Sequence, residues 1–205
     1  LGGTGAGKTT LLKILSGTEK PYRGKIKIFG KSIEKYSSEE LHRKNTALLP
    51  QNVADIFIKS KVKDDLYDIC ALFGDSKKDT ETKIENVCRD LGITSLLEKH
   101  PYDISCGEIQ KCAIAKLLLT EPRILFLDEP TKALDSAAKK EFAKIISDLK
   151  SNGVTIVAVT HDVEFAAENA DRCALFFEGE IIASSKKEKF FSDNNFYTTA
   201  ASRIA

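Results

Sequence analysis

A glycine-rich segment at the start of the chain has the spacing of a phosphate-binding loop. Residues 2–10 read GGTGAGKTT and fit the pattern G-x-x-x-x-G-K-[ST]. Glycines let successive backbone N–H groups turn toward phosphate oxygens, and the helix that follows directs its positive end at the same anion. Lys8 is expected to reach the β- and γ-phosphates of a nucleotide, and the Thr9 hydroxyl to ligate Mg²⁺. The predicted binding set is the whole loop: Gly2, Gly3, Thr4, Gly5, Ala6, Gly7, Lys8, Thr9 and Thr10.

Two adjacent acids follow an apolar run further along the chain. Residues 124–127 read ILFL, and Asp128 and Glu129 come next. A strand buried on both faces would place these acids at the carboxyl edge of a parallel sheet, where ligands bind. Asp128 is expected to hold the coordination sphere of the metal, and Glu129 to accept a proton from an attacking water. A strand followed by a solvated acidic turn is the alternative, and the glycine loop upstream disfavours it.

Apolar patterns predict the elements that must position these residues. Strands are expected at 25–29, 47–49, 124–128, 154–160, 174–177 and 180–183. Helices are expected at 8–16, 62–72, 80–91, 107–120, 137–151 and 163–169. The alternation predicts an α/β fold with a mostly parallel sheet. The polar, mostly helical stretch 52–102 is predicted to be a helical subdomain inserted into an α/β core made of residues 1–51 and 103–205, all within one domain.

Composition narrows the class of protein. The 205 residues are 42% hydrophobic and 30% charged, as in ordinary globular proteins, and no apolar stretch approaches the roughly 20 residues that span a bilayer. The net charge of +1 produces only a weak electrostatic field, so nucleic acid is not expected as the main partner. The five cysteines show no C-x-x-C spacing, which favours a reducing compartment, and most are expected to be buried. Because the glycine loop begins right after Leu1 and Met is absent, further N-terminal residues are expected.

These motifs, with four more in order, make the chain resemble the ATP-binding cassette (ABC) family over nearly its whole length. Residues 48–51 (LLPQ) look like the Q-loop, and residues 104–108 (ISCGE) look like the LSGGQ signature at the head of a helix. Residues 133–135 (ALD) look like the D-loop, and residues 160–162 (THD) look like the segment with the switch histidine. A series of motifs in this order, with spacings along the chain that suit the family, is specific to this family.

The resemblance implies a P-loop NTPase that binds ATP with Mg²⁺ and hydrolyses it. It assigns Glu129, His161 and Gln51 to catalysis, and Thr9, Gln51 and Asp128 to Mg²⁺. In this family the ATP sites form between two cassettes arranged head to tail. The signature would therefore bind the nucleotide of a partner cassette through Ser105, Cys106, Gly107 and Glu108.

The signature departs from the family pattern at one position. Cys106 stands where the family has the first glycine of a pair. A side chain there would crowd the nucleotide of the partner cassette or point away from it. We therefore hypothesise that the composite site using this signature is slower than usual. Without the family context, Ser105 would be interpreted as a plain helix cap.

A narrower resemblance, carried by residues 171–177 and 190–201, is to the ATPases of energy-coupling-factor importers, especially those with two cassettes in one chain. It implies uptake of a vitamin, its precursor or a metal ion. The implied partners are a second cassette, in the same chain or another subunit, and transmembrane subunits. The protein would act at the cytoplasmic face of the membrane, and nucleic acid is not expected as a partner.

Two alternatives stay open: a soluble relative that acts on ribosomes, and a regulatory cassette with weak hydrolysis. DNA-repair relatives are disfavoured because Lys8 and Ser105 are only about 97 positions apart, with no heptad run.

Overall fold

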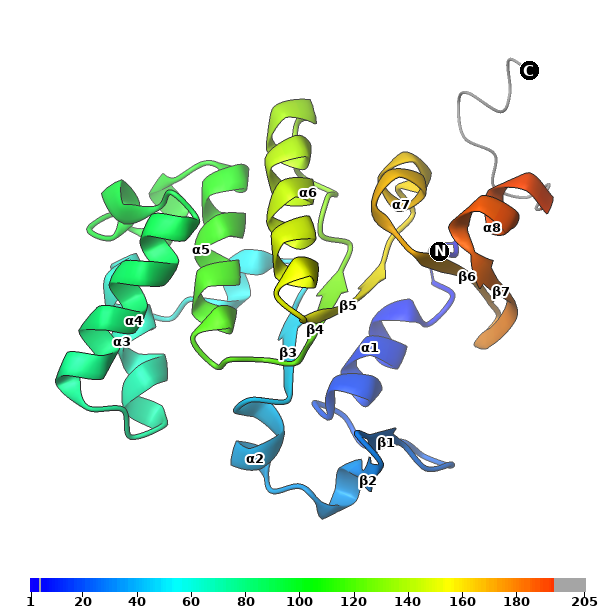
Figure 1. Ribbon diagram of the computed structural model, residues 1–205, viewed down its shortest axis with the longest axis horizontal. Coiled ribbons are helices and arrows are strands. Elements are labelled where there is room, and N and C mark those ends of the chain that lie inside the picture. Colours follow the sequence, from blue (N-terminus) through cyan, green and yellow to red (C-terminus); the bar gives the residue numbers. More distant parts are fainter. Residues whose placement is uncertain (4, 194–205) are drawn as a thin grey trace.

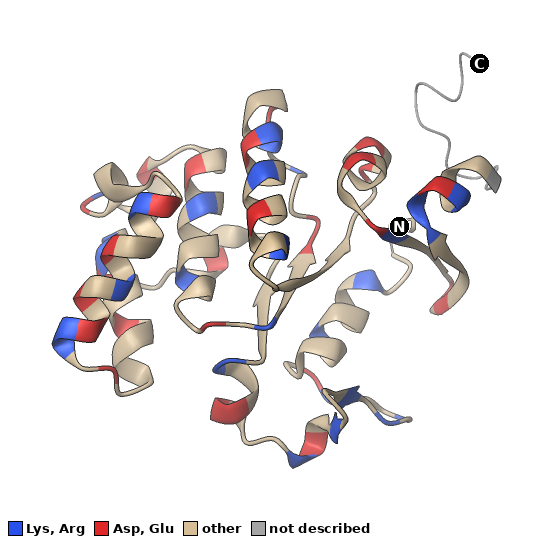
Figure 2. Ribbon diagram, viewed as in Figure 1, with Lys and Arg blue, Asp and Glu red and all other residues tan. Residues whose placement is uncertain are grey.

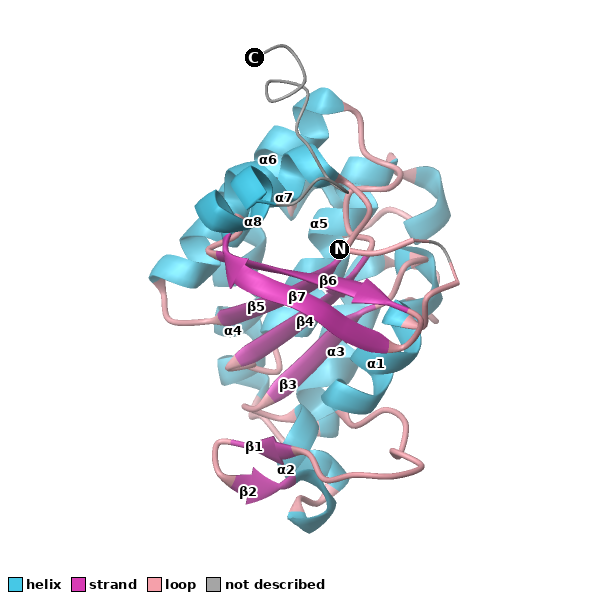
Figure 3. Ribbon diagram, turned by 90° about the vertical axis from the view of Figure 1, so that its right-hand side faces the viewer, coloured by secondary structure: helices cyan, strands magenta, loops and turns pink. Residues whose placement is uncertain are grey.

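A parallel sheet covered by helices on both faces forms the centre of the molecule (Figure 1). The computed structural model describes residues 1–3 and 5–193. The sheet has the order β3 (Thr46–Leu49), β4 (Ile124–Asp128) and β5 (Thr155–Val159). Helix α1 (Lys8–Ser16) covers one face, while α5 (Cys106–Leu118) and α6 (Ser136–Ser151) cover the other (Figure 3). The predicted α/β class and the parallel pairing of these three strands are confirmed.

Strand β4 is buried on both faces. Phe126 packs with Leu12 of α1 and with Val159 of β5 in one apolar cluster. Leu125 and Leu127 point to the opposite face, where they join the large core cluster that also includes residues of α5 and α6. Each such side chain contributes roughly 1.5–3 kcal/mol by leaving water. Asp128 and the following Glu129 are therefore positioned by a strand that is packed on both faces.

The stretch 52–102 is mostly helical, as the sequence predicts. It contains α3 (Val62–Leu72), α4 (Lys77–Asp90) and the 3₁₀ turns η2 (Val53–Ile56), η3 (Thr94–Leu96) and η4 (Pro101–Asp103). Its helices pack on α5, and its apolar side chains belong to the same core cluster as those of the sheet. Its role as a subdomain with its own motion stays a prediction. Among residues 1–3 and 5–193, no helix has the length and hydrophobicity to cross a membrane.

Two antiparallel hairpins lie outside the parallel sheet. One joins β1 (Lys27–Ile28) to β2 (Lys31–Ser32), and the other joins β6 (Arg172–Phe177) to β7 (Glu180–Lys186). The strand predicted at 25–29 is shorter because Phe29 (φ 50°) and Gly30 (φ 81°) form the turn. The remaining elements complete the fold: η1 (Ile33–Lys35), α2 (Ser38–His42), α7 (Val163–Asn169) and α8 (Lys187–Asp193).

The helices predicted at 8–16, 62–72 and 163–169 have the predicted bounds, whereas the start of α4 follows its local cap. Helix α4 begins three residues before the predicted start at 80, because the Ser76 side chain accepts a hydrogen bond from the Asp79 backbone N–H at 3.2 Å. The neighbouring Asp75 forms ion pairs with Arg43 and Lys83. Figure 2 shows that positions with Lys, Arg, Asp and Glu are distributed along the helices.

Most cysteines are buried, as expected. Of the five, all free and all within the described residues, Cys70, Cys88, Cys112 and Cys173 are buried and Cys106 is exposed. Burial raises the pKa of Cys88 to about 11 and that of Cys112 to about 12. These two thiols therefore stay protonated at neutral pH and act as small apolar side chains of the core.

Candidate functional site

The Lys8 ammonium lies inside the glycine loop and beside the acids of β4. Helix α1 begins at Lys8, directly after Gly7, whose φ of 91° suits glycine. The Lys8 Nζ donates hydrogen bonds to the carbonyls of Gly2 and Gly3, both at 2.8 Å, and lies 3.8 Å from Glu129 Oε1. The Lys8 side chain is buried, so this charge faces the interior of the loop. Thr4, part of the predicted loop, lies outside the described residues.

Hairpin β6–β7 holds the start of the loop from the other side. The Leu1 main chain pairs with β6: its N donates to Ala174 O and its O accepts from Phe176 N, both at 2.8 Å. A Cβ added to Gly2 would lie only 2.4 Å from Phe176 O. Glycine is thus required at residue 2, because the backbone of the loop and the backbone of β6 approach closely there. The start of the loop is held in place on β6.

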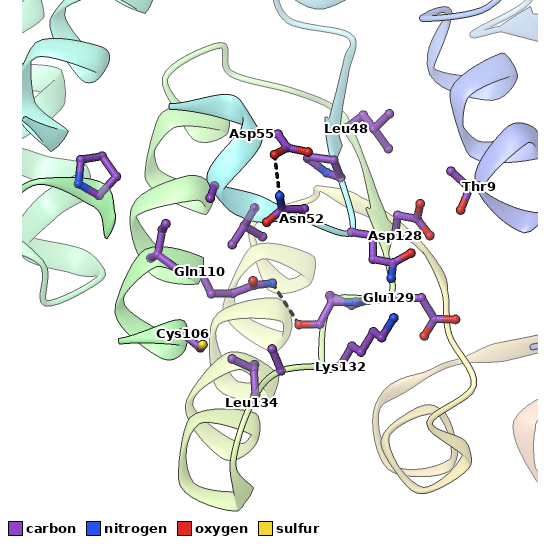
Figure 4. A pocket seen from close by; sticks show the side chains of 18 of the residues that line it. Thr9, Leu48, Asn52, Asp55, Cys106, Gln110, Asp128, Glu129, Lys132 and Leu134 are labelled. Carbon is purple, nitrogen blue, oxygen red and sulfur yellow. Dashed lines mark hydrogen bonds between the residues drawn. The ribbon is translucent and has the colours of Figure 1, made fainter. Parts of the chain in front are cut away.

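Asp128 and Thr9 line one cavity of about 810 Å³ (Figure 4). Gln51 and Glu129 line it as well, so the structure brings together the predicted metal ligands and the predicted base. Asp128 is only 3% exposed, and its Oδ1 has no hydrogen-bond partner among the described residues. A buried carboxylate oxygen without a partner is costly, and a cation would satisfy it.

These side chains suit Mg²⁺. Carboxylate, hydroxyl and amide oxygens are hard ligands, and Mg²⁺ is commonly held by one or two carboxylates together with substrate phosphates and waters. The described part of the chain has no group of three or more His, Cys, Asp or Glu side chains that could hold a metal. The donors present therefore fit a Mg²⁺ whose coordination the phosphates complete, rather than an all-protein site.

Glu129 and His161 form a direct pair at the carboxyl ends of β4 and β5. The Glu129 Oε2 lies 2.7 Å from His161 Nδ1 and accepts a hydrogen bond from the His161 backbone N at 3.2 Å. The Glu129 side chain is 11% exposed, whereas that of His161 is 60% exposed. A carboxylate held by an imidazole in this way can orient a water molecule and accept its proton.

The signature residues lie on the surface at the head of α5. Ser105 and Glu108 form a capping box: the Ser105 Oγ accepts from Glu108 N at 3.3 Å, and Glu108 Oε2 accepts from Ser105 N at 2.8 Å. The backbone hydrogen bond from Ser105 lowers the pKa of the Glu108 carboxyl. Gly107 is packed tightly, because an added Cβ would lie 3.1 Å from the Ala138 Cβ of α6. Ser105 and Cys106 are exposed, so a partner can reach them.

The other two motifs lie in loops near the cavity. Gln51 is exposed between β3 and η2, and it lines the cavity. The Asp135 side chain accepts a hydrogen bond from Ala138 N at 2.8 Å and so caps α6. The D-loop therefore leads directly into the helix that packs against Gly107.

Sequence patterns alone did not single out two polar side chains that hold the loop after Glu129. Gln110 of α5, which is 5% exposed, donates to Pro130 O at 3.0 Å. Thr131, which is 2% exposed, donates to Asp162 Oδ2 at 3.1 Å. Their one sequence signal is proximity to a motif, since Thr131 lies two residues after Glu129 and Gln110 two residues after Glu108, while their burial appears only once the helices pack.

Family comparison places the chain among known proteins. The model of the ABC transporter family matches residues 1–132, which is more than half of the chain. A second model, of an AAA domain, matches residues 100–167. Both matches include the acids at the end of β4.

Individual relatives agree with the family match. A Bacillus anthracis protein that carries the name of an ABC transporter ATP-binding protein is 39% identical over all 205 residues, but the chain spans only 36% of its length. The energy-coupling factor transporter ATP-binding protein EcfA of Malacoplasma penetrans is 36% identical over 98% of this chain and 70% of its own length.

A solved structure shows the same fold. CbiO1 from Clostridium perfringens, part of the ABC transporter complex CbiONQ, superposes with a TM-score of 0.82 at 27% identity, over 94% of this chain and 78% of that one. The sequence matches and the shared fold lead to one conclusion. The chain belongs to the ABC transporter family, as one of its ATP-binding cassettes.

Proposed function

We propose that this cassette hydrolyses ATP at the cavity beside its glycine loop and that hydrolysis drives a membrane importer of the energy-coupling-factor kind. One observation carries the proposal. The Lys8 ammonium lies 3.8 Å from the Glu129 carboxylate, so a phosphate-binding cation and a candidate base share one site. Asp128, whose Oδ1 has no hydrogen-bond partner within the described part of the chain, is the residue before that base.

The substrate is held by the loop. Backbone N–H groups of residues 2–10 and the N-terminus of α1 bind the phosphates, and Lys8 contributes the positive charge. Thr9, Gln51 and Asp128 would hold Mg²⁺, which when bound neutralises charge on the phosphates. Positioning and electrostatic stabilisation of this kind account for most of the catalysis of phosphoryl transfer.

A water molecule attacks the phosphorus of the γ-phosphate in line with the bond between this phosphorus and the oxygen of the leaving ADP, and that bond breaks. Glu129 accepts a hydrogen bond from this water and takes its proton, because its carboxylate ends at the same cavity as Asp128. His161 orients the Glu129 carboxylate through the 2.7 Å contact to Oε2. The ADP and phosphate that form no longer bridge two cassettes, so the pair opens.

The pairing of two cassettes explains the exposed signature. The ATP site of the second cassette is completed by the signature residues Ser105, Cys106, Gly107 and Glu108. When the two cassettes close, the helical subdomain 52–102 transmits this motion to transmembrane subunits at the cytoplasmic face of the membrane. The relatives support this arrangement: EcfA is an energy-coupling factor transporter protein, and CbiO1 is part of a transporter complex. The solute would be a vitamin, its precursor or a metal ion.

The test of this function is a single substitution in the full-length protein. Glu129→Gln should still bind ATP but lose on the order of 10²-fold or more in turnover, because the amide cannot take the proton of the water. Glu178→Gln is the matched control: Glu178 is also a glutamate with positive φ (48°), but it is exposed in the β6–β7 turn. Near-normal hydrolysis by Glu129→Gln would exclude Glu129 as the main catalytic carboxylate.

A second candidate function is a regulatory cassette that closes on ATP with weak hydrolysis. The exposed side chain of Cys106 favours it, because this thiol stands where the partner nucleotide would approach. Single-turnover hydrolysis by the full-length protein with its partners separates the two functions. Copurification with ribosomes instead of transmembrane subunits would overturn the importer assignment.

A further inference from the structure

The loops that carry Glu129 and His161 are joined by a second contact beyond the one between these two residues. We propose that Thr131 and Asp162 form a latch that positions His161 against Glu129, so that both are positioning residues of the reaction. The inference rests on the proposed function of the Glu129 site. It assigns a role to two residues that do not themselves touch the substrate.

His161 needs such support because packing does not hold it. Its side chain is 60% exposed, and its ring contacts Glu129 Oε2 at 2.7 Å. An exposed imidazole retains several rotamers unless its backbone and a partner fix it. The conformation of residues 160–162 therefore decides whether the ring meets Glu129.

Asp162 fixes that backbone segment. Its N–H donates to Thr160 Oγ1 at 3.0 Å, and its Oδ1 accepts from Phe165 N at 3.0 Å as the cap of α7. Its Oδ2 accepts from Thr131 Oγ1 at 3.1 Å and from Lys139 Nζ at 2.5 Å. Asp162 is thus tied to its own helix by one oxygen and to the opposite loop and α6 by the other.

The Thr131 end of the latch is rigid. Thr131 is 2% exposed and lies two residues after Glu129, in the loop that follows β4. At the base of the same two loops, Glu129 N donates to Val159 O at 2.9 Å. The Glu129–His161 contact lies between this backbone bond and the latch in chain order. Loss of the latch would leave the Glu129–His161 contacts and the backbone bond from Glu129 N to Val159 O to join the two loops.

The competing explanation is that Asp162 only caps α7. The two roles can be tested separately, because Oδ1 makes the cap and Oδ2 makes the latch. Asp162→Asn retains an acceptor for Phe165 N, and Asn is as good a helix cap as Asp. The amide nitrogen that replaces Oδ2 cannot accept from Lys139, and toward Thr131 it can only donate to the hydroxyl, which reverses that hydrogen bond. Thr131→Val removes the hydroxyl at nearly constant shape, and Thr131→Ser restores it.

The experiment measures kcat, KM for ATP and the unfolding midpoint of the full-length protein. Thr131→Val and Asp162→Asn should each lower kcat about tenfold or more at nearly unchanged KM, because misplaced catalytic groups reduce turnover rather than binding. Thr131→Ser should recover most of the loss. The double variant should be no slower than the slower single variant, because both substitutions act on the same contact.

A spectroscopic readout does not depend on turnover. The chain has three histidines, so the ring nitrogens of His161 can be assigned by selective labelling and a His161→Gln variant. In Thr131→Val and Asp162→Asn, the His161 signals should move toward those of Glu129→Gln. Lys150→Met is the matched control: it removes the 2.9 Å ion pair of α6 with Asp171 and should change neither kcat nor these signals.

The outcomes distinguish the latch from the proposed function. Wild-type kcat and His161 signals in Thr131→Val and Asp162→Asn would overturn the latch, as would a fall in the unfolding midpoint without any change in the signals. Full activity of Glu129→Gln would overturn the proposed function instead. If the wild-type protein hydrolysed no ATP with its partners, the proposed function would fail, and the His161 signals would still decide whether the latch exists.

Discussion

Backbone conformation distinguishes Glu129 among the residues of the site. Its φ of 47° lies in the left-handed region, which costs a residue with a side chain roughly 1–2 kcal/mol. The strain persists because the backbone N donates to Val159 O and the carboxylate is held by His161. This conformation turns the side chain away from the course of β4 and toward Lys8.

Cys106 is the residue at which the family pattern and this chain differ. Its side chain is exposed and lines the cavity, and the crowding hypothesis is that it interferes with a hydrogen bond from the signature backbone to the partner nucleotide. One such bond contributes about 1 kcal/mol, so Cys106→Gly should raise the ATPase rate about fivefold. Steady-state hydrolysis by the full-length protein measures this. Cys106→Ser keeps a side chain of similar size and should show no gain. An unchanged rate in Cys106→Gly would remove the crowding hypothesis.

Helix α5 connects the signature to the segment after the Q-loop. The Lys116 Nζ donates to Asp65 Oδ1 at 2.6 Å and to Ile56 O at 2.5 Å. Asp65 is fully buried, and it also accepts hydrogen bonds from Ile58 N and Lys59 N. The pair therefore ties α5, α3 and the chain that follows Gln51 into one unit.

Removal of one member of this buried pair should be far more costly than removal of a surface pair. Lys116→Met should lower the free energy of unfolding by about 3–5 kcal/mol, because Asp65 is left charged and buried. Lys111→Met, on the same helix, removes the exposed 3.2 Å pair with Glu141 and should cost at most about 1 kcal/mol. Denaturant titration compares the two variants. Equal losses would mean that the Asp65 carboxylate finds another partner.

At the scale of the whole molecule, the glycine loop is clamped between the parallel sheet and hairpin β6–β7. The acid that lies 3.8 Å from Lys8 is Glu129, directly after β4, while the carbonyl that packs on Gly2 comes from Phe176 of β6. The apolar side chains of Leu1, Leu175 and Phe190 support this junction. The position of the loop thus depends on segments from both ends of the described chain (Figure 3).

Gly2 should be the least replaceable residue of this junction. Gly2→Ala places a methyl group 2.4 Å from Phe176 O, and overpacking of this kind typically costs about 1–3 kcal/mol of unfolding free energy. Gly3→Ala meets no atom within 4 Å and should leave the unfolding midpoint nearly unchanged. Thermal unfolding of both variants measures the difference. Equal unfolding midpoints of the two variants would show that β6 shifts to accommodate the added methyl group.

The sequence by itself determined the local features of this protein. The spacing of residues 2–10 specifies a loop followed by α1, and the apolar run 124–127 specifies a buried strand that ends in two acids. Such features depend on neighbours in the chain, so periodicity and glycine content suffice to predict them. The start of α4 was missed because the Ser76 cap overrides periodicity.

Only the tertiary structure decided which distant residues meet. Thr131 and Asp162 are 31 positions apart, and Lys116 and Asp65 are 51 apart. Contacts of this kind form after the strands have paired and the helices have packed, and polar residues that end up buried look the same in the sequence as solvated ones. Burial and partner choice are properties of the packed molecule, because the cost of an unpaired polar group arises only where water is excluded.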